Sequence, residues 1–179
     1  MGRLSGKQIL LIVAQKNYNE EEYSYLDNLF IEEGAVVAVA SHSMDKALGR
    51  LDGYVVPHLT IADAETKNYD AIVLIGGYGA YTSLWDDADL HRILKEANSG
   101  HKLIAAASVS PVALANADLL QGKKATVYPD YNAAVILQQK GAVHVHDKVV
   151  VDDNIITSNQ PRWIKEFAEM IISKLTEGR

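Results

Sequence analysis

The sequence contains no cysteine among its 179 residues. That absence excludes disulfide bonds, thiolate metal sites and catalysis by a thiol of this chain. Long apolar runs are missing too, because runs such as residues 9–14 and 71–75 fall far below the ~20 residues that a membrane-spanning helix needs. No charged-then-apolar leader opens the chain. We therefore expect a cytoplasmic protein with no membrane contact.

An excess of positive charge is also absent. The formal net charge is −6, the sequence pI is about 5.5, and lysine and arginine are scattered along the chain. Binding to the phosphate backbone of a nucleic acid requires a basic surface, so we expect no nucleic-acid partner. Apolar residues make up 48% of the 179 residues, which suffices for one sizeable core. We expect a single domain over residues 1–179.

Four short apolar runs have the composition of strands that are buried on both faces of a sheet. These runs are residues 8–14, 36–40, 71–75 and 102–106. Between them, and in a final stretch over residues 164–175, apolar side chains recur with helical period. Strands that alternate with helices predict an α/β fold with a doubly wound, mostly parallel sheet flanked by helices.

Local signals refine this fold at three places. Asn19 and Glu22 have the spacing of a helix-capping box and Gly34 is placed to end the helix, which predicts a helix over residues 20–33. Two β-branched runs, 149–151 and 155–157, flank a turn-forming segment and predict a small antiparallel hairpin. The β-rich pieces around Pro57 predict a second antiparallel excursion over residues 51–61.

The carboxyl ends of parallel strands meet at one edge of such a sheet, where ligands usually bind. Three segments are expected there: residues 15–22, the glycine turn at 76–79 and residues 106–111. Ser108 lies between small residues at a strand-to-helix turn, which suits either an exposed nucleophile or a purely structural turn. The N–H groups of Gly76 and Gly77 either face an anion or an oxyanion, or belong to a flexible turn.

Four blocks of the sequence carry a family resemblance. They are residues 69–77 (YDAIVLIGG), 103–111 (LIAAASVSP), 119–126 (LLQGKKAT) and 151–158 (VDDNIITS). In this order they resemble the DJ-1/PfpI superfamily, whose corresponding blocks read YDalvlPGG, iaAiChGP, LLkGkkaT and vDgnliTS. The resemblance covers nearly the whole chain. It implies the flavodoxin-like fold of the class I glutamine amidotransferase type.

The resemblance also implies roles for particular residues. Ser108 stands at the position of the family's cysteine nucleophile, and Glu22 at that of a glutamate that hydrogen-bonds the nucleophile. Val109 and Tyr128 stand where many members have histidine, and Tyr81 where some peptidase-like members have an acidic residue. Ser108 and Glu22 are therefore the candidate catalytic residues, although a capping role alone would also account for Glu22.

The absent cysteine directs the functional prediction. A serine hydroxyl needs a positioned base, whereas a cysteine ionises by itself, and the residue after Ser108 is a valine. We expect a homo-oligomer, as the family implies, that binds a small carbonyl or carboxylate ligand or has a stress-protective role, without a cofactor. The expected binding residues are Gly76, Gly77, Val109 and Tyr128.

Other functions remain open at this point. One alternative is a hydrolase, a peptidase-like enzyme or a glyoxalase/deglycase that uses Ser108 and Glu22. Another is a chaperone-like scaffold that acts through exposed apolar surface. A serine introduced in place of a natural cysteine would give the same sequence.

Two further patterns bear on the site. His144 and His146 fall on one face of a predicted strand beside Asp147, and they either bind a divalent metal or belong to a solvated face. Because no third ligand is suitably spaced, no metal site is predicted. Several tyrosines either line the pocket or pack at a core or dimer boundary: Tyr18, Tyr23, Tyr78, Tyr81 and Tyr128.

Overall fold

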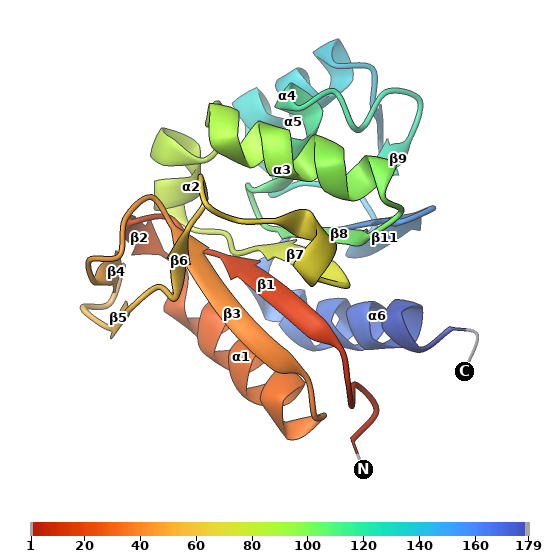
Figure 1. Ribbon diagram of the computed structural model, residues 1–179. Helices are drawn as coiled ribbons and strands as arrows, with labels where there is room; N and C mark the ends of the chain where they lie inside the picture. Colours follow the sequence, from red (N-terminus) through yellow and green to blue (C-terminus); the bar gives the residue numbers. More distant parts are fainter. Residues whose placement is uncertain (1, 178–179) are drawn as a thin grey trace.

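A computed structural model describes residues 2–177 of the chain. Its centre is a seven-stranded sheet in the order β11-β12-β8-β7-β1-β3-β6 (Figure 1). The strands of this sheet are β1 (Gln8–Ile12), β3 (Val36–Ser41), β6 (Leu59–Thr60), β7 (Ala71–Leu74), β8 (Leu103–Ala107), β11 (Val149–Asp152) and β12 (Ile155–Ser158). Neighbouring strands are parallel except β11 and β12, which form the predicted antiparallel hairpin. The predicted doubly wound, mostly parallel sheet is confirmed.

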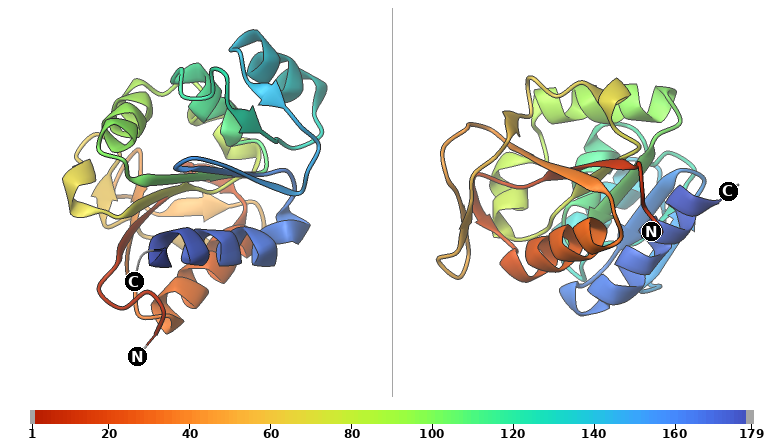
Figure 2. Two further views of the ribbon diagram at one scale, coloured as in Figure 1. Left: turned by 90° about the vertical axis from the view of Figure 1, so that its right-hand side faces the viewer. Right: turned by 60° about the horizontal axis from the view of Figure 1, so that its bottom comes forward.

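Helices cover both faces of the sheet. In Figures 1 and 2, α1 and α6 lie on one face, and α3, α4 and α5 lie on the opposite side. The helices are α1 (Glu20–Glu32), α2 (Tyr78–Ser83), α3 (Ala88–Ser99), α4 (Pro111–Asn116), α5 (Tyr131–Gln139) and α6 (Ile164–Thr176), with 3₁₀ turns at Thr66–Asn68 and Pro161–Trp163. Within residues 2–177, no helix is both long enough and apolar enough to cross a bilayer.

Two small sheets flank the central one. The first contains β2 (Lys16–Tyr18), β4 (Ala47–Gly49) and β5 (Tyr54–Val55), and the second pairs β9 (Lys124–Ala125) with β10 (Val143–His144). The antiparallel excursion predicted over residues 51–61 is right only for its first half. There β5 runs antiparallel to β4, whereas β6 joins the central sheet parallel to β3. A local β pattern does not reveal which distant strand will be the partner, and this caused the error.

The first helix begins as the sequence predicts, but its capping box is incomplete. The Asn19 side chain accepts hydrogen bonds from the N–H groups of Glu21 and Glu22, each at 3.1 Å. Gly34, with a φ of +90°, follows the end of the helix. The reciprocal bond is missing, because the Asn19 N–H donates to the carbonyl oxygen of Gly76. The Glu22 carboxyl is therefore directed elsewhere.

Burial follows the strand prediction at the centre of the sheet and departs from it at one side. Every residue of β7 and β8 is buried. In β3, however, Val36 is 57% exposed, although this strand was expected to be buried on both faces. The reason is pairing: β6 contacts only Ala40 and Ser41, so the first half of β3 lies at an open edge.

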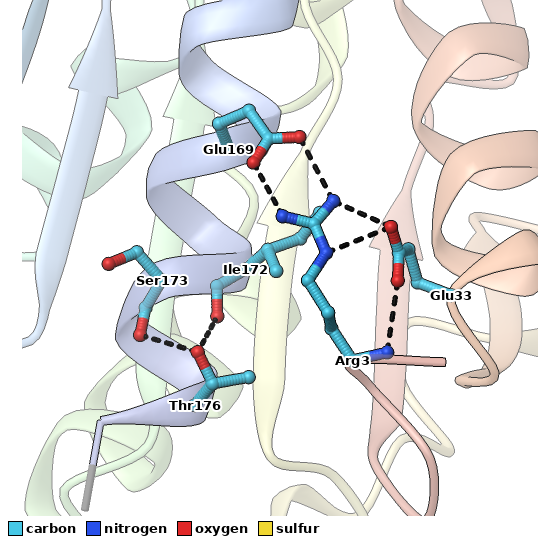
Figure 3. A network of polar contacts seen from close by, with 6 residues as sticks. All are labelled: Arg3, Glu33, Glu169, Ile172, Ser173 and Thr176. Atoms are coloured by element: carbon cyan, nitrogen blue, oxygen red, sulfur yellow. Dashed lines mark hydrogen bonds and ion pairs between the residues drawn. The ribbon is translucent and has the colours of Figure 1, made fainter. Parts of the chain in front are cut away.

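An arginine near the amino terminus joins the two helices of one face (Figure 3). Arg3 Nη2 donates to Oε1 of Glu33 at 2.6 Å, and Arg3 Nη1 donates to Oε2 of Glu169 at 2.7 Å. Glu33 follows the last residue of α1, whereas Glu169 lies within α6. The guanidinium holds the pKa of both carboxyls below their ordinary value, chiefly through these hydrogen bonds.

Candidate functional site

The candidate site lies where the direction of winding changes in the central sheet. β1 has β3 on one side and β7 on the other, and β8 follows β7. Carboxyl ends of strands at such a switch point form a crevice in doubly wound folds. The segments that follow β1, β7 and β8 supply Glu22, Gly76 and Ser108, which are in direct contact. The structure thus brings together the three segments that the sequence predicted to meet.

Ser108 occupies a sharp turn directly after β8. Its φ is +57°, a conformation that residues other than glycine adopt rarely, and its side chain is buried. Neighbouring segments hold this backbone on both sides. The Ser108 N–H donates to the carbonyl oxygen of Ser158 at 2.9 Å, and its own carbonyl accepts from the Tyr128 N–H at 2.8 Å. These bonds stabilise the left-handed conformation.

Glu22 is a buried acid bound to both other segments. Its Oε1 accepts a hydrogen bond from Ser108 Oγ at 2.5 Å, and its Oε2 accepts from the Gly76 N–H at 2.7 Å. Burial raises the pKa of the Glu22 carboxyl above its ordinary value, and the two hydrogen bonds offset part of that effect. The neutral carboxylic acid is therefore favoured more than in a solvated glutamate.

The two glycines serve different purposes. Gly77 has a φ of +109°, whereas a Cβ on Gly76 would lie 2.7 Å from Ser108 Cβ and 2.9 Å from Glu22 Oε2. The expectation that both N–H groups could face an anion is wrong for Gly76, because Glu22 already accepts its N–H. Within residues 2–177, the N–H groups of Gly77 and Val109 have no hydrogen-bond partner. They are open donors in the turns that follow β7 and β8.

A cavity of about 620 Å³ opens beside Ser108. Its lining residues are Asn19, Arg50, Gly77, Tyr78, Tyr81, Ser108, Val109, Tyr128, Asp130 and Pro161. Of the residues predicted to bind a ligand, Gly77, Val109 and Tyr128 line this cavity. Gly76 does not, and it contacts the site only through its bond to Glu22.

The tyrosines divide between the cavity and the core. Tyr78, Tyr81 and Tyr128 line the cavity. Tyr18 is buried in the core cluster, and its ring meets that of Tyr23 edge-on with the ring centroids 5.8 Å apart. The pocket-lining alternative therefore holds for Tyr78, Tyr81 and Tyr128, and the packing alternative holds for Tyr18 and Tyr23.

Several lining residues were missed from the sequence. Arg50 comes from the loop between β4 and β5, where its Nη2 donates to Oε2 of Glu21 at 2.9 Å, and no local pattern marked it. Asp130 caps α5 by accepting the Ala133 N–H at 2.9 Å, so an aspartate directly before a helix was a usable signal. Asn19 lies in the segment 15–22 that was expected at the site, although its own pattern indicated only a cap, and no pattern marked Pro161.

The histidine pair lies apart from these lining residues. The rings of His144 and His146 are 4.8 Å apart, but they do not share a strand face, because β10 ends at His144. Burial is the main cause that lowers the pKa of His144, and the neighbouring His146 is the second. In the part of the chain that the structure describes, no group of three or more acidic or histidine side chains could hold a metal ion.

Comparisons with known proteins extend the likeness over the chain. The family model described as "DJ-1/PfpI family" matches residues 7–174. An uncharacterized protein of Methanocaldococcus jannaschii is 33% identical over 175 residues, which cover 98% of this chain and 85% of that protein. Protein dj-1beta of Drosophila melanogaster is 29% identical over 167 residues, covering 92% and 88%.

Solved structures agree in fold. A ThiJ/PfpI domain protein from Brachyspira murdochii has a TM-score of 0.91 at 27% identity, covering 98% of this chain and 99% of that one. Drosophila melanogaster DJ-1beta has a TM-score of 0.83 at 28% identity, covering 98% and 91%. The likeness therefore includes all the elements that surround Ser108.

Proposed function

Because this chain belongs to the DJ-1/PfpI family, we propose that it binds a small carbonyl or carboxylate compound in the cavity at Ser108, without covalent chemistry. The observation that carries the proposal is the partner of the serine hydroxyl. Ser108 Oγ donates to a buried carboxyl whose pKa is raised, and no histidine is among the residues that line the cavity. A serine so placed lacks the neutral imidazole that usually removes its proton.

The protonation state of Glu22 decides whether this carboxyl can act as a base towards Ser108. When Glu22 is neutral, its proton lies on Oε1, because Oε2 accepts the Gly76 N–H. The hydrogen bond is then reversed, so Glu22 Oε1 donates to Ser108 Oγ and Glu22 has no capacity to take the serine proton. The cavity retains the open N–H groups of Gly77 and Val109 and the guanidinium of Arg50. All three suit a carbonyl oxygen or a carboxylate.

The test combines turnover with binding. Methylglyoxal consumption and the protection by pyruvate against thermal unfolding are measured in the wild type and in a folded Ser108→Ala variant. We expect no turnover in either protein and a raised unfolding temperature in both, because the N–H groups and Arg50 remain. A rate that disappears in Ser108→Ala would contradict the proposal, and so would the absence of protection by pyruvate.

A second candidate function is an enzyme that uses Ser108 and Glu22, such as a hydrolase, a peptidase-like enzyme or a glyoxalase/deglycase. The strained φ of +57° and the 2.5 Å contact to Glu22 favour it. In this mechanism the ionised Glu22 accepts the proton of Ser108 while Oγ attacks a substrate carbonyl. The rate then rises with pH through the raised pKa of Glu22, and a flat profile would argue against this candidate.

We also propose that the protein forms a homo-oligomer through the segment 44–56. This segment carries five apolar side chains that are between 46% and 61% exposed: Met44, Leu48, Leu51, Tyr54 and Val56. Exposed apolar side chains that gather in one segment are typical of an interaction surface, whereas single scattered ones are normal. Light scattering should give a mass above the 19.6 kDa of one chain, and Leu51→Lys should lower that mass. A monomer that suppresses aggregation of a heated client would favour the scaffold function instead.

A further inference from the structure

Two aromatic rings that line the cavity, those of Tyr78 and Tyr81, belong to a row that continues to Trp85 behind them. Tyr78 and Tyr81 are stacked with ring centroids 6.1 Å apart and planes 14° apart. Tyr81 in turn lies against Trp85, with centroids 3.8 Å apart and planes tilted by 32°. The row runs from a buried end at Trp85, which is 6% exposed, to an open end at Tyr78, which is 68% exposed. Its outer ring is a large apolar surface left largely open to solvent.

Hydrogen bonds hold the inner part of this row in place. Trp85 Nε1 donates to the carbonyl oxygen of Val109 at 2.9 Å, which fixes the indole to the turn that carries Ser108. The hydroxyl of Tyr81 donates to Asp130 Oδ1 at 3.4 Å and accepts from Asn132 Nδ2 at 3.3 Å. Trp85 and Tyr81 are thus held in place, and Tyr78 stacks on this ordered base, which lowers the cost of ordering these rings when a ligand binds.

The remaining lining of the cavity complements an aromatic anion. Tyr128 and Pro161 add apolar surface. Arg50 is the only cation among the lining residues, and the structure gives its guanidinium a single hydrogen bond, to Glu21. Asp130 is the only lining residue with a carboxylate, and it already accepts from the Ala133 N–H and from Tyr81. Arg50 is therefore the lining side chain that can pair with the acid group of a ligand, in exchange for or alongside its contact with Glu21.

We infer that the cavity selects carboxylates or 2-oxo acids that carry an aromatic ring, with the ring stacked on Tyr78 and the acid group held by Arg50. The inference rests on the proposed function, because it specifies the ligand class of the same cavity. Tyr78 and Tyr81 are thereby specificity-determining residues. An alkyl ligand of equal charge would leave the face of Tyr78 in water, whereas a phenyl ring would cover it.

Two 2-oxo acids separate ring recognition from recognition of the acid group. Pyruvate and benzoylformate have the same 2-oxo acid group and differ in carrying a methyl or a phenyl substituent. Isothermal titration of the wild type should show benzoylformate binding at least about tenfold more tightly than pyruvate, from burial of the ring and its stacking. Equal dissociation constants for the two acids would overturn the inference and leave the proposed function standing.

Variants at exposed tyrosines provide the matched control. Tyr78→Ala should weaken benzoylformate about five- to tenfold and change pyruvate less than twofold, whereas Tyr78→Phe should bind both as the wild type does. Tyr131 is 83% exposed and does not line the cavity, so Tyr131→Ala should leave both ligands unaffected. An equal effect of the two alanine variants would overturn the assignment of Tyr78.

The acid group is tested separately. Arg50→Met should weaken pyruvate and benzoylformate by the same factor, about tenfold or more, because both lose the guanidinium. Circular dichroism checks that each variant is folded. Binding of neither acid to the wild type at millimolar concentration would refute the proposed function itself, and the ligand class with it. If benzoylformate binds tightly and Arg50→Met leaves its dissociation constant unchanged, then Arg50 does not hold the carboxylate and this part of the inference is refuted.

Discussion

Replacing Glu22 by glutamine tests whether this side chain is a buried acid with a raised pKa. Glutamine has the same shape, and its amide oxygen can accept the Gly76 N–H while its amide nitrogen donates to Ser108 Oγ, so both contacts survive and the bond to Ser108 is reversed. The substitution therefore removes the titration and little else. Any change in the pH dependence of stability then reports on the carboxyl.

The sign of the effect follows from proton binding. Burial raises the folded pKa of Glu22 above the ordinary value of 4.5, so the folded state keeps a proton that the unfolded state has lost. Above pH 4.5 the contribution of Glu22 to stability falls by at most about 1.4 kcal/mol per pH unit until the folded pKa is passed, and it then levels off. Glu22→Gln lacks this loss, so its stability relative to the wild type should rise over that window.

An alanine at the same position should lower stability at every pH in this window. Glu22→Ala leaves the Gly76 N–H and the Ser108 hydroxyl buried without an acceptor. Each orphaned group costs about 1–3 kcal/mol, so the free energy of unfolding should fall by about 2–6 kcal/mol. The large gap between the alanine and glutamine variants is the signature of a buried hydrogen-bonding group, as distinct from a surface charge.

The assay is urea unfolding followed by circular dichroism at several pH values between 4.5 and 8. Glu32→Gln, an exposed position on the same helix, is the control and should follow the wild type throughout. Parallel pH curves for the wild type and Glu22→Gln would refute the raised pKa. A glutamine variant as unstable as the alanine variant would refute the assigned hydrogen bonds.

Two further predictions concern packing and a surface network. Gly76→Ala should lower the free energy of unfolding by about 1–3 kcal/mol, because its Cβ would lie 2.7 Å from Ser108 Cβ; unchanged denaturant midpoints would contradict this. Arg3→Ala should lower the urea midpoint at pH 7 but much less at pH 3. The stability linked to the lowered pKa values of Glu33 and Glu169 is present above about 4.5 and is lost as pH falls through the folded values. A difference that persists unchanged at pH 3 would contradict that reasoning.

Much of the fold was predictable because its signals are local. Residues 71–75 are an uninterrupted apolar run, and a run of this kind is stable only between two covering layers. Asn19 marks the start of α1, because its short polar side chain satisfies N–H groups two and three residues ahead. Both predictions depend only on residues that are neighbours in the sequence, so they can be made without knowing how the rest of the chain folds.

The site was predictable in outline and not in detail. The small residues around Ser108 indicated a tight turn, and the observed φ of +57° agrees with one. Arg50 was missed because it reaches the cavity from a loop whose strand pairing no local pattern reveals. For Gly76, the sequence left open whether its N–H faces an anion or belongs to a flexible turn, and the structure shows this N–H bound to Glu22.

The sequence by itself determined the absence of thiol chemistry, the alternation of strands and helices, and the place of Ser108 after a buried strand. The family resemblance implied a contact between Glu22 and Ser108, but only the tertiary structure decided that the Glu22 carboxyl also accepts the Gly76 N–H and does not complete its own capping box. The reason is distance along the chain. Glu22 is separated by 86 residues from Ser108 and by 54 from Gly76, so their hydrogen bonds exist only once β1, β7 and β8 lie side by side. The same assembly buries the carboxyl and raises its pKa, which no pattern of neighbouring residues encodes.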